Sequence, residues 1–83
     1  MGNPDLTLAD IPKGGKASVV SFGDIPLSLK LMEMGCIPGE TITVDQYAPM
    51  GDPISITVAG YRLSLRLNEA EMIWVEEIAV SNL

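Results

Sequence analysis

The sequence predicts a mostly-β domain, a small, partly open barrel of about five short strands, with one short helix after the first strand and a helical turn before the last. Two observations predict this fold class. Short runs in which apolar and polar residues alternate, the pattern of half-buried strands, are separated by turns rich in glycine and proline. The chain has 83 residues, 47% of them hydrophobic and 19% charged, which is the size and composition of one folded domain. We therefore predict a single domain over residues 1–83, with a core over about 6–78 and loose ends.

The first strand is predicted over residues 16–22, where β-branched and aromatic residues follow the turn Lys13-Gly14-Gly15. Gly23-Asp24 ends this strand. Asp24 is also placed to cap a helix, because an aspartate side chain accepts a hydrogen bond from a free backbone N–H of the first helical turn. The helix is predicted over about Ile25–Met34.

One face of this helix is expected to pack on the sheet. Leu27, Leu31 and Met34 recur at the spacing of a helical face. Gly35 then suits the left-handed residue that ends a helix, because glycine has no Cβ to clash at positive φ.

The next strand is predicted over Thr41–Tyr47, where Ile42 and Val44 alternate with polar residues and are expected to face the core. Residues 48–53 follow, with two prolines and a glycine among six residues. Such a composition predicts a loop with a fixed shape.

A hairpin is predicted after this loop. Its first strand contains Ile54, Ile56 and Val58, which alternate with polar residues. Ala59-Gly60 can form the tight turn, and the second strand contains Tyr61, Leu63 and Leu65.

The chain is predicted to end with a helical turn and a strand. Asn68 and Glu71 have the spacing of a capping box, which indicates a turn over 68–71 before a last strand over Met72–Ile78. Residues 79–83 are expected to be loose. Short strands joined by tight turns favour a barrel of the SH3-like kind, because closing a sheet removes its exposed edges.

The charge and composition limit the partners. The net charge of −6 repels phosphate backbones and anionic lipid headgroups, so neither nucleic acid nor direct membrane insertion is expected. No apolar run approaches the roughly 18 residues of a membrane span, and residues 1–10 lack the pattern of a signal peptide. A single cysteine excludes an internal disulfide. We therefore predict a cytoplasmic location and a protein partner.

The residue inventory argues against an enzyme. The chain has no histidine, the side chain most often used for proton transfer at neutral pH. Cys36 has no base or cationic neighbour in sequence and is interpreted as a buried core residue. The carboxylate pairs Glu69/Glu71 and Glu76/Glu77 are interpreted as solvated charges. Without histidine and with one cysteine, no tightly bound metal or cofactor is predicted.

Methionine and tryptophan supply candidate contacts for a protein partner. Met50 is expected to be exposed in the loop 48–53, where it offers an adaptable apolar contact. Met32, Met34 and Met72 are interpreted as fillers of gaps in the core, and the alternative is that they form an adaptable docking surface together with Met50.

Trp74 is the second candidate contact. If Ile73 and Val75 point inward, strand alternation turns Trp74 outward and makes it a possible binding anchor. The alternative is that Trp74 packs under the N-terminal segment.

Three ordered segments closely resemble the FeoA family, the small cytoplasmic components of bacterial ferrous iron transport. They are Lys30-Leu31-Met32-Glu33-Met34-Gly35-Cys36-Ile37-Pro38-Gly39, then Ala48-Pro49-Met50-Gly51-Asp52-Pro53-Ile54, then Leu63-Ser64-Leu65-Arg66 followed by Glu69-Ala70. The resemblance runs from about Leu6 to Ile78. It implies an SH3-like barrel with a non-catalytic, accessory role beside the membrane GTPase permease FeoB, whose cargo is ferrous iron. It also implies recruitment to the inner face of the plasma membrane by that partner.

Combined with the residue analysis, the resemblance predicts a partner-binding set. The set consists of Pro49, Met50, Gly51, Asp52, Trp74 and Lys30, the last standing where the family commonly has arginine. The alternative function is weak metal sensing through carboxylates such as Asp52 and Glu69, as in the SH3-like domain of iron-dependent repressors. The residues do not distinguish activation of the permease from its restraint, or a monomer from a self-associated form.

Overall fold

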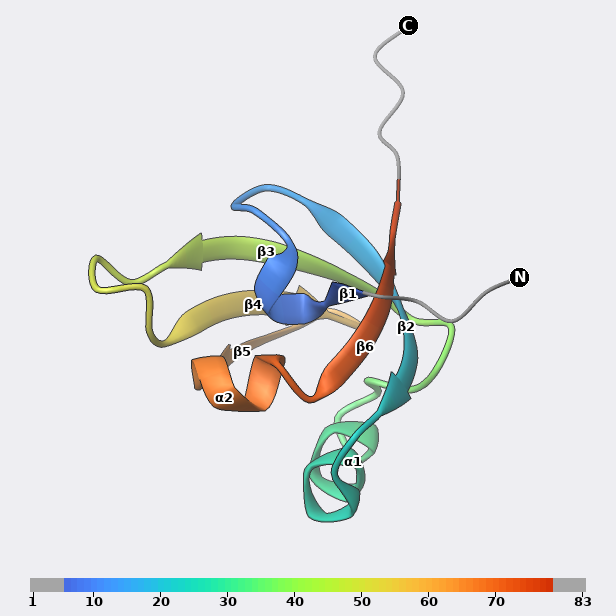
Figure 1. Ribbon diagram of the computed structural model, residues 1–83. Coiled ribbons are helices and arrows are strands. Elements are labelled where there is room, and N and C mark those ends of the chain that lie inside the picture. Colours follow the sequence, from blue (N-terminus) through green and yellow to red (C-terminus); the bar gives the residue numbers. More distant parts are fainter. Residues whose placement is uncertain (1–5, 79–83) are drawn as a thin grey trace, which may run out of the picture.

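The computed structural model describes residues 6–78 and confirms the mostly-β, partly open barrel (Figure 1). The strands are β1 (Leu6–Thr7), β2 (Lys16–Phe22), β3 (Thr41–Tyr47), β4 (Ile54–Val58), β5 (Tyr61–Leu65) and β6 (Ile73–Glu77). The helices are a 3₁₀ turn η1 (Leu8–Asp10), α1 (Ile25–Met32) and α2 (Leu67–Ala70). The expectation of loose ends falls on residues 1–5 and 79–83, which lie outside the described residues. No helix within residues 6–78 combines the length and the apolar character needed to cross a bilayer.

All strand pairs in the sheet are antiparallel, in the order β1-β6-β2-β3-β4-β5. The two-residue strand β1 is an addition to the predicted strands, and its residues pair Leu6 with Val75 and Thr7 with Trp74. The register shifts once between β2 and β6 and once between β3 and β4. Such bulges increase the local twist, which helps a single sheet curl into an open barrel.

The core is built from the alternating residues that the sequence predicts. Ile42 and Val44 of β3 and Ile73 and Val75 of β6 are completely buried. On β4, Ile54, Ile56 and Val58 all face the core. On β5 only Leu65 is fully buried and Tyr61 is exposed, because β5 is the last strand of the sheet and no further strand covers it.

Helix α1 begins as predicted but ends earlier. The Asp24 carboxylate accepts a hydrogen bond from the Leu27 N–H at 2.9 Å, which confirms the predicted cap. Leu27 and Leu31 are buried against the sheet, but Met34 is 37% exposed, so its predicted place on the docking face is wrong. The helix stops at Met32, and the Cys36 N–H bonds to the Leu31 carbonyl at 3.0 Å. Because of this turn, the side chain that is buried after the end of the helix is that of Cys36 and not that of Met34.

Gly35 forms the turn after α1 and is held by two constraints. Its φ of +90° lies in the left-handed region, as predicted. A Cβ built at this position would lie 2.8 Å from the Cβ of Ala59, in the β4–β5 turn. Gly35 therefore allows the chain to turn at the end of α1, and it allows this turn to pack closely against the β4–β5 turn.

Candidate functional site

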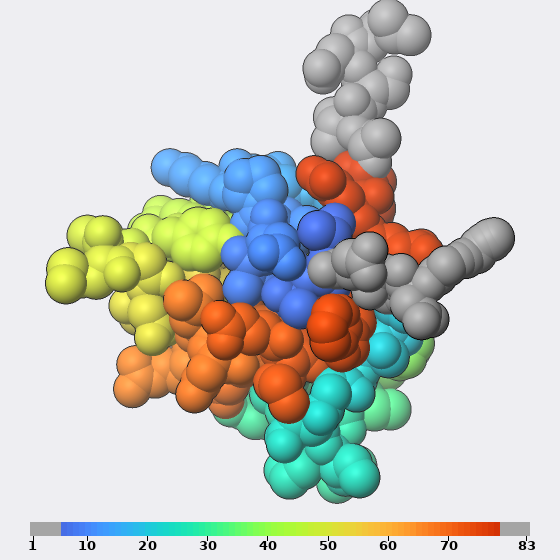
Figure 2. Space-filling view, in the orientation of Figure 1, coloured from blue at the N-terminus to red at the C-terminus, as the bar shows by residue number. Residues whose placement is uncertain are grey.

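Helix α1 carries an exposed apolar stripe on the side opposite its buried leucines. Ile25 is 74% exposed, Leu29 is 60% exposed and Met32 is 43% exposed. Positions spaced by four and three residues lie on one helical face, so these three side chains form one surface, here called the α1 stripe. Figure 2 shows α1, in teal, projecting from one end of the domain. A contiguous apolar surface on a projecting helix is typical of a protein-docking site.

A groove separates α1 from α2 and adjoins the α1 stripe. Its volume is about 360 Å³, and its lining residues are Asp24, Pro26, Leu27, Lys30, Asn68, Glu69 and Met72. Successive residues of an α-helix are turned by roughly 100°, so Pro26 and Lys30 lie between the α1 stripe and the buried Leu27. The stripe and this α1–α2 groove are therefore neighbouring parts of one surface.

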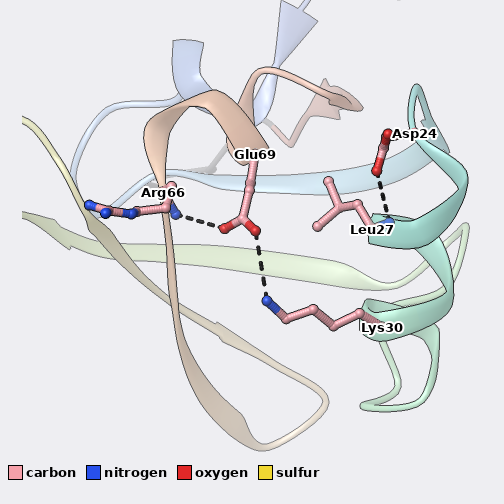
Figure 3. A network of polar contacts seen from close by, with 5 residues as sticks. All are labelled: Asp24, Leu27, Lys30, Arg66 and Glu69. Atoms are coloured by element: carbon pink, nitrogen blue, oxygen red, sulfur yellow. Dashed lines mark hydrogen bonds and ion pairs between the residues drawn. The ribbon is translucent and has the colours of Figure 1, made fainter.

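Lys30 and Glu69 join the two sides of the groove (Figure 3). The Lys30 Nζ lies 3.7 Å from Glu69 Oε2, and the Lys30 side chain is 55% exposed. Exposed ion pairs of this kind contribute about 0–1 kcal/mol to stability. The contact therefore positions the two helices only weakly and is easily exchanged for another.

Helix α2 is capped differently from the sequence prediction. The predicted box of Asn68 and Glu71 is wrong, because Arg66 is the capping residue and its backbone N–H donates to Glu69 Oε1 at 2.9 Å (Figure 3). The Leu67 N–H donates to Asp52 Oδ1 at 2.9 Å. The 48–53 loop thus satisfies one of the free N–H groups of α2, a contact between residues fifteen apart that no local spacing indicates.

The predicted partner-binding residues do not gather in one place. Lys30 and Asp52 both contact α2, one through Glu69 and the other through Leu67. Met50 is 92% exposed. Its neighbour Pro49 is also exposed. Gly51, also in this loop, is half-buried. In Figure 1 the loop after β3 and helix α1 lie at different corners of the molecule.

Trp74 lies on a third part of the surface. It points outward from β6, as the burial of Ile73 and Val75 requires, and is 37% exposed. Its cross-strand partners are Thr7 of β1 and Ser21 of β2. Trp74 therefore faces outward, as one prediction has it, and it also lies beside the N-terminal strand β1, as the alternative has it.

The prediction that Met32, Met34 and Met72 fill gaps in the core is wrong. Met32, Met34 and Met72 are all among the exposed large hydrophobic residues. Met32 belongs to the α1 stripe, and Met72 lines the α1–α2 groove. The buried positions are instead filled by leucine, isoleucine, valine, alanine and Cys36, so these three exposed methionines offer adaptable apolar contacts on the surface.

The Cys36 thiol is completely buried, as predicted. Burial, together with the nearby negative charge of Glu40, raises the pKa of the thiol to about 11. At neutral pH the thiol is therefore protonated, and a protonated thiol is neither a nucleophile nor a good metal ligand.

The carboxylates considered for metal sensing have other partners. Asp52 accepts a hydrogen bond from Leu67, and Glu69 contacts both Arg66 and Lys30. Among the residues that the structure describes, no three His, Cys, Asp or Glu side chains are grouped to hold a metal ion.

We predict that anaerobic calorimetric titration with ferrous iron or zinc shows no binding tighter than about micromolar, because the chain has no histidine and its single cysteine is buried. The double variant Asp52→Asn/Glu69→Gln, which keeps the acceptor atoms, serves as the control for weak carboxylate binding. A tight one-to-one isotherm for the parent, lost in the double variant, would contradict the prediction and support metal sensing.

The sequence reasoning missed Ile25 and Leu29. A signal for them was available, because the eight residues of α1 include apolar side chains on both sides of the helix. A helix that packs on a sheet by one stripe leaves its other face to solvent or to a partner.

Comparisons with known proteins identify a family for this chain. The sequence profile described as the FeoA domain matches residues 6–77. A ferrous iron transport protein A/FeoB fusion protein of Porphyromonas gingivalis is 36% identical over 75 residues, which are 89% of this chain but 9% of the fusion protein. An FeoA-like protein from Clostridium acetobutylicum has a similar structure, with a TM-score of 0.84 and 33% identity over 100% of this chain and 96% of that one.

A third similar structure is the FeoA of Stenotrophomonas maltophilia in complex with zinc. It has a TM-score of 0.76 and 29% identity, and the match covers 86% of this chain and 89% of that one. That protein is described as a procaryotic SH3 domain protein, which agrees with the SH3-like fold expected from the sequence.

Proposed function

The chain belongs to the FeoA family, and from this premise we propose that it is an accessory protein of ferrous iron uptake that docks on the cytoplasmic part of a FeoB-type membrane GTPase permease. The fusion protein of P. gingivalis supports the choice of partner, since it carries a domain like this one in the same chain as a FeoB. Linking two domains raises their effective concentration for each other, which is useful where they work in contact.

The α1 stripe is the single observation that carries this proposal. Three large apolar side chains on one projecting helix are costly to leave in water and gain free energy when a partner covers them. We assign the primary contact to this stripe, with the α1–α2 groove beside it. The loop 48–53 and Trp74 are then secondary contacts or lie outside the interface.

The proposed role is non-catalytic. The domain biases a conformational equilibrium of the permease, which requires that it bind one state of the permease more tightly than another. It holds no tightly bound cofactor of its own, and ferrous iron is the cargo of its partner. It acts on the cytoplasmic side, at the inner face of the plasma membrane, through a protein contact rather than through lipid or nucleic acid, as its net charge of −6 favours.

The test is a binding measurement with the complete FeoB permease of the same organism in lipid nanodiscs. We expect saturable binding of the domain, with affinities that differ between the GDP-bound and the GTP-analogue-bound permease. Empty nanodiscs are the control for binding to lipid. Absence of binding in both nucleotide states would contradict docking, and equal affinity in the two states would contradict the conformational role alone.

Weak metal sensing is a second candidate, supported by the zinc complex of the S. maltophilia relative. The calorimetric titration described above tests it, because weak binding by the parent that is lost in the Asp52→Asn/Glu69→Gln variant would support metal sensing through these carboxylates. Docking remains the first choice because, among residues 6–78, no three His, Cys, Asp or Glu side chains are grouped to hold a metal ion.

A further inference from the structure

We propose that the α1–α2 groove receives a basic side chain, arginine or lysine, of the permease. The aliphatic part of this side chain lies on Pro26, Leu27 and Met72, and its charged end lies between the carboxylates of Asp24 and Glu69. This inference rests on the proposed function, since the permease supplies the side chain. It adds the chemistry of the residue that is recognised beside the α1 stripe.

The lining of the groove matches a long side chain with a charged end. Pro26, Leu27 and Met72 provide an apolar portion, and Asp24 and Glu69 provide acidic groups. Arginine and lysine combine an aliphatic stem with a terminal cation, so both portions of the groove are used by one side chain. A purely apolar side chain would use only the apolar portion of the groove and would bring no positive charge to the two carboxylates.

The charges of the groove favour a cation. Asp24 and Glu69 contribute two negative charges, and Lys30 contributes one positive charge, so the lining is acidic by one charge. Asp24 uses Oδ2 for the Leu27 N–H, and within residues 6–78 its Oδ1 makes no hydrogen bond. An arginine can donate to such an oxygen with a strong, charge-assisted hydrogen bond. The net charge of −6 also attracts a basic segment of a partner.

Lys30 acts as an internal competitor for the same site. Its ammonium group already lies 3.7 Å from Glu69 Oε2, which shows that a cation fits at this position (Figure 3). The Lys30 side chain is 55% exposed, so it can move into solvent without crossing the core. An incoming basic side chain therefore displaces Lys30 from Glu69, and removal of the Lys30 charge strengthens binding.

The experiment compares charge-removing variants that preserve the local hydrogen bonds. Asp24→Asn keeps a side-chain oxygen to cap α1, and Glu69→Gln keeps an acceptor for the Arg66 N–H. Lys30→Met removes the competing cation and keeps most of the aliphatic stem. Glu76→Gln, on the exposed side of β6, removes a charge far from the groove and is the matched control. Binding of each variant to the permease in nanodiscs is measured beside its melting temperature.

We expect Asp24→Asn and Glu69→Gln each to weaken binding by about fivefold or more, with a shallower dependence on salt concentration. Lys30→Met is expected to bind at least as tightly as the parent, and Glu76→Gln is expected to bind like the parent. If Asp24→Asn and Glu69→Gln bind like the parent, the groove receives no cation, although docking stands. If Lys30→Met weakens binding as Glu69→Gln does, the ion pair only positions α1, and the inference is wrong. If the parent itself does not bind the permease, the proposed function fails as well.

Discussion

The Gly35→Val variant is expected to melt about 10 °C or more below the parent. A β-branched residue at positive φ costs about 1–3 kcal/mol, and for a domain of this size each kcal/mol lowers the melting temperature by about 4–8 °C. The φ of Gly35 is +90°, and a Cβ there lies 2.8 Å from the Ala59 Cβ, so the β4–β5 turn must also shift. Valine adds two methyl groups to this contact. Thermal melting followed by circular dichroism measures the effect.

Gly39 supplies the matched control for this prediction. Its φ is +94°, but a Cβ at Gly39 meets no atom within 4 Å. Gly39→Ala therefore reports the cost of the backbone conformation alone, and Gly35→Ala reports the same cost with the contact to Ala59 added. Equal melting temperatures for the two alanine variants would show that the contact with Ala59 has no energetic consequence. A Gly35→Val protein that melts like the parent would contradict the structure of the α1 end.

The Leu29→Ala variant is expected to lose about 30-fold in affinity for the permease with little change in melting temperature. Leu29 is the central residue of the α1 stripe and is 60% exposed, so truncation removes contact with a partner more than contact within the domain. Truncating an anchor residue typically costs about 2 kcal/mol, which is about 30-fold in affinity. Alanine is also a strong helix former, so α1 itself is preserved. Titration of the permease nanodiscs measures the affinity.

Three variants control the interpretation of Leu29→Ala. Leu31→Ala changes a completely buried leucine two residues away and should lower stability by about 2–5 kcal/mol, so any loss of binding there follows from the fold. Met50→Ala and Trp74→Ala test the partner-binding residues predicted from the sequence. If either of these folded variants loses affinity while Leu29→Ala does not, the interface lies on the 48–53 loop or on β6 and not on α1.

Local periodicity accounts for most of the fold that sequence reasoning predicted. Strands β2 and β3 have the predicted bounds, and the alternation in β3, β4 and β6 identifies buried residues correctly. The Asp24 cap and the left-handed Gly35 follow from the chemistry of single residues in a short segment. These features depend on neighbours within a few residues, so the sequence contains the information directly.

The candidate site depended on contacts that local patterns do not encode. The pairing of β1 with β6, the hydrogen bond from the Leu67 N–H to Asp52 and the contact of Lys30 with Glu69 all join segments that are far apart in the chain. The early end of α1 exposed Met34 where continued helical spacing predicted burial.

The sequence by itself therefore determined the barrel class, the inward faces of its strands and the absence of histidine chemistry. Only the tertiary structure decided that α1 keeps an apolar face free and that α2 forms a groove beside it. The physical reason is that hydrophobic pattern specifies which residues avoid water, whereas the surfaces left uncovered are determined by where helices and loops pack. Both faces of α1 carry apolar side chains, and only the position of the sheet selects Leu27 and Leu31 for burial and leaves Leu29 exposed.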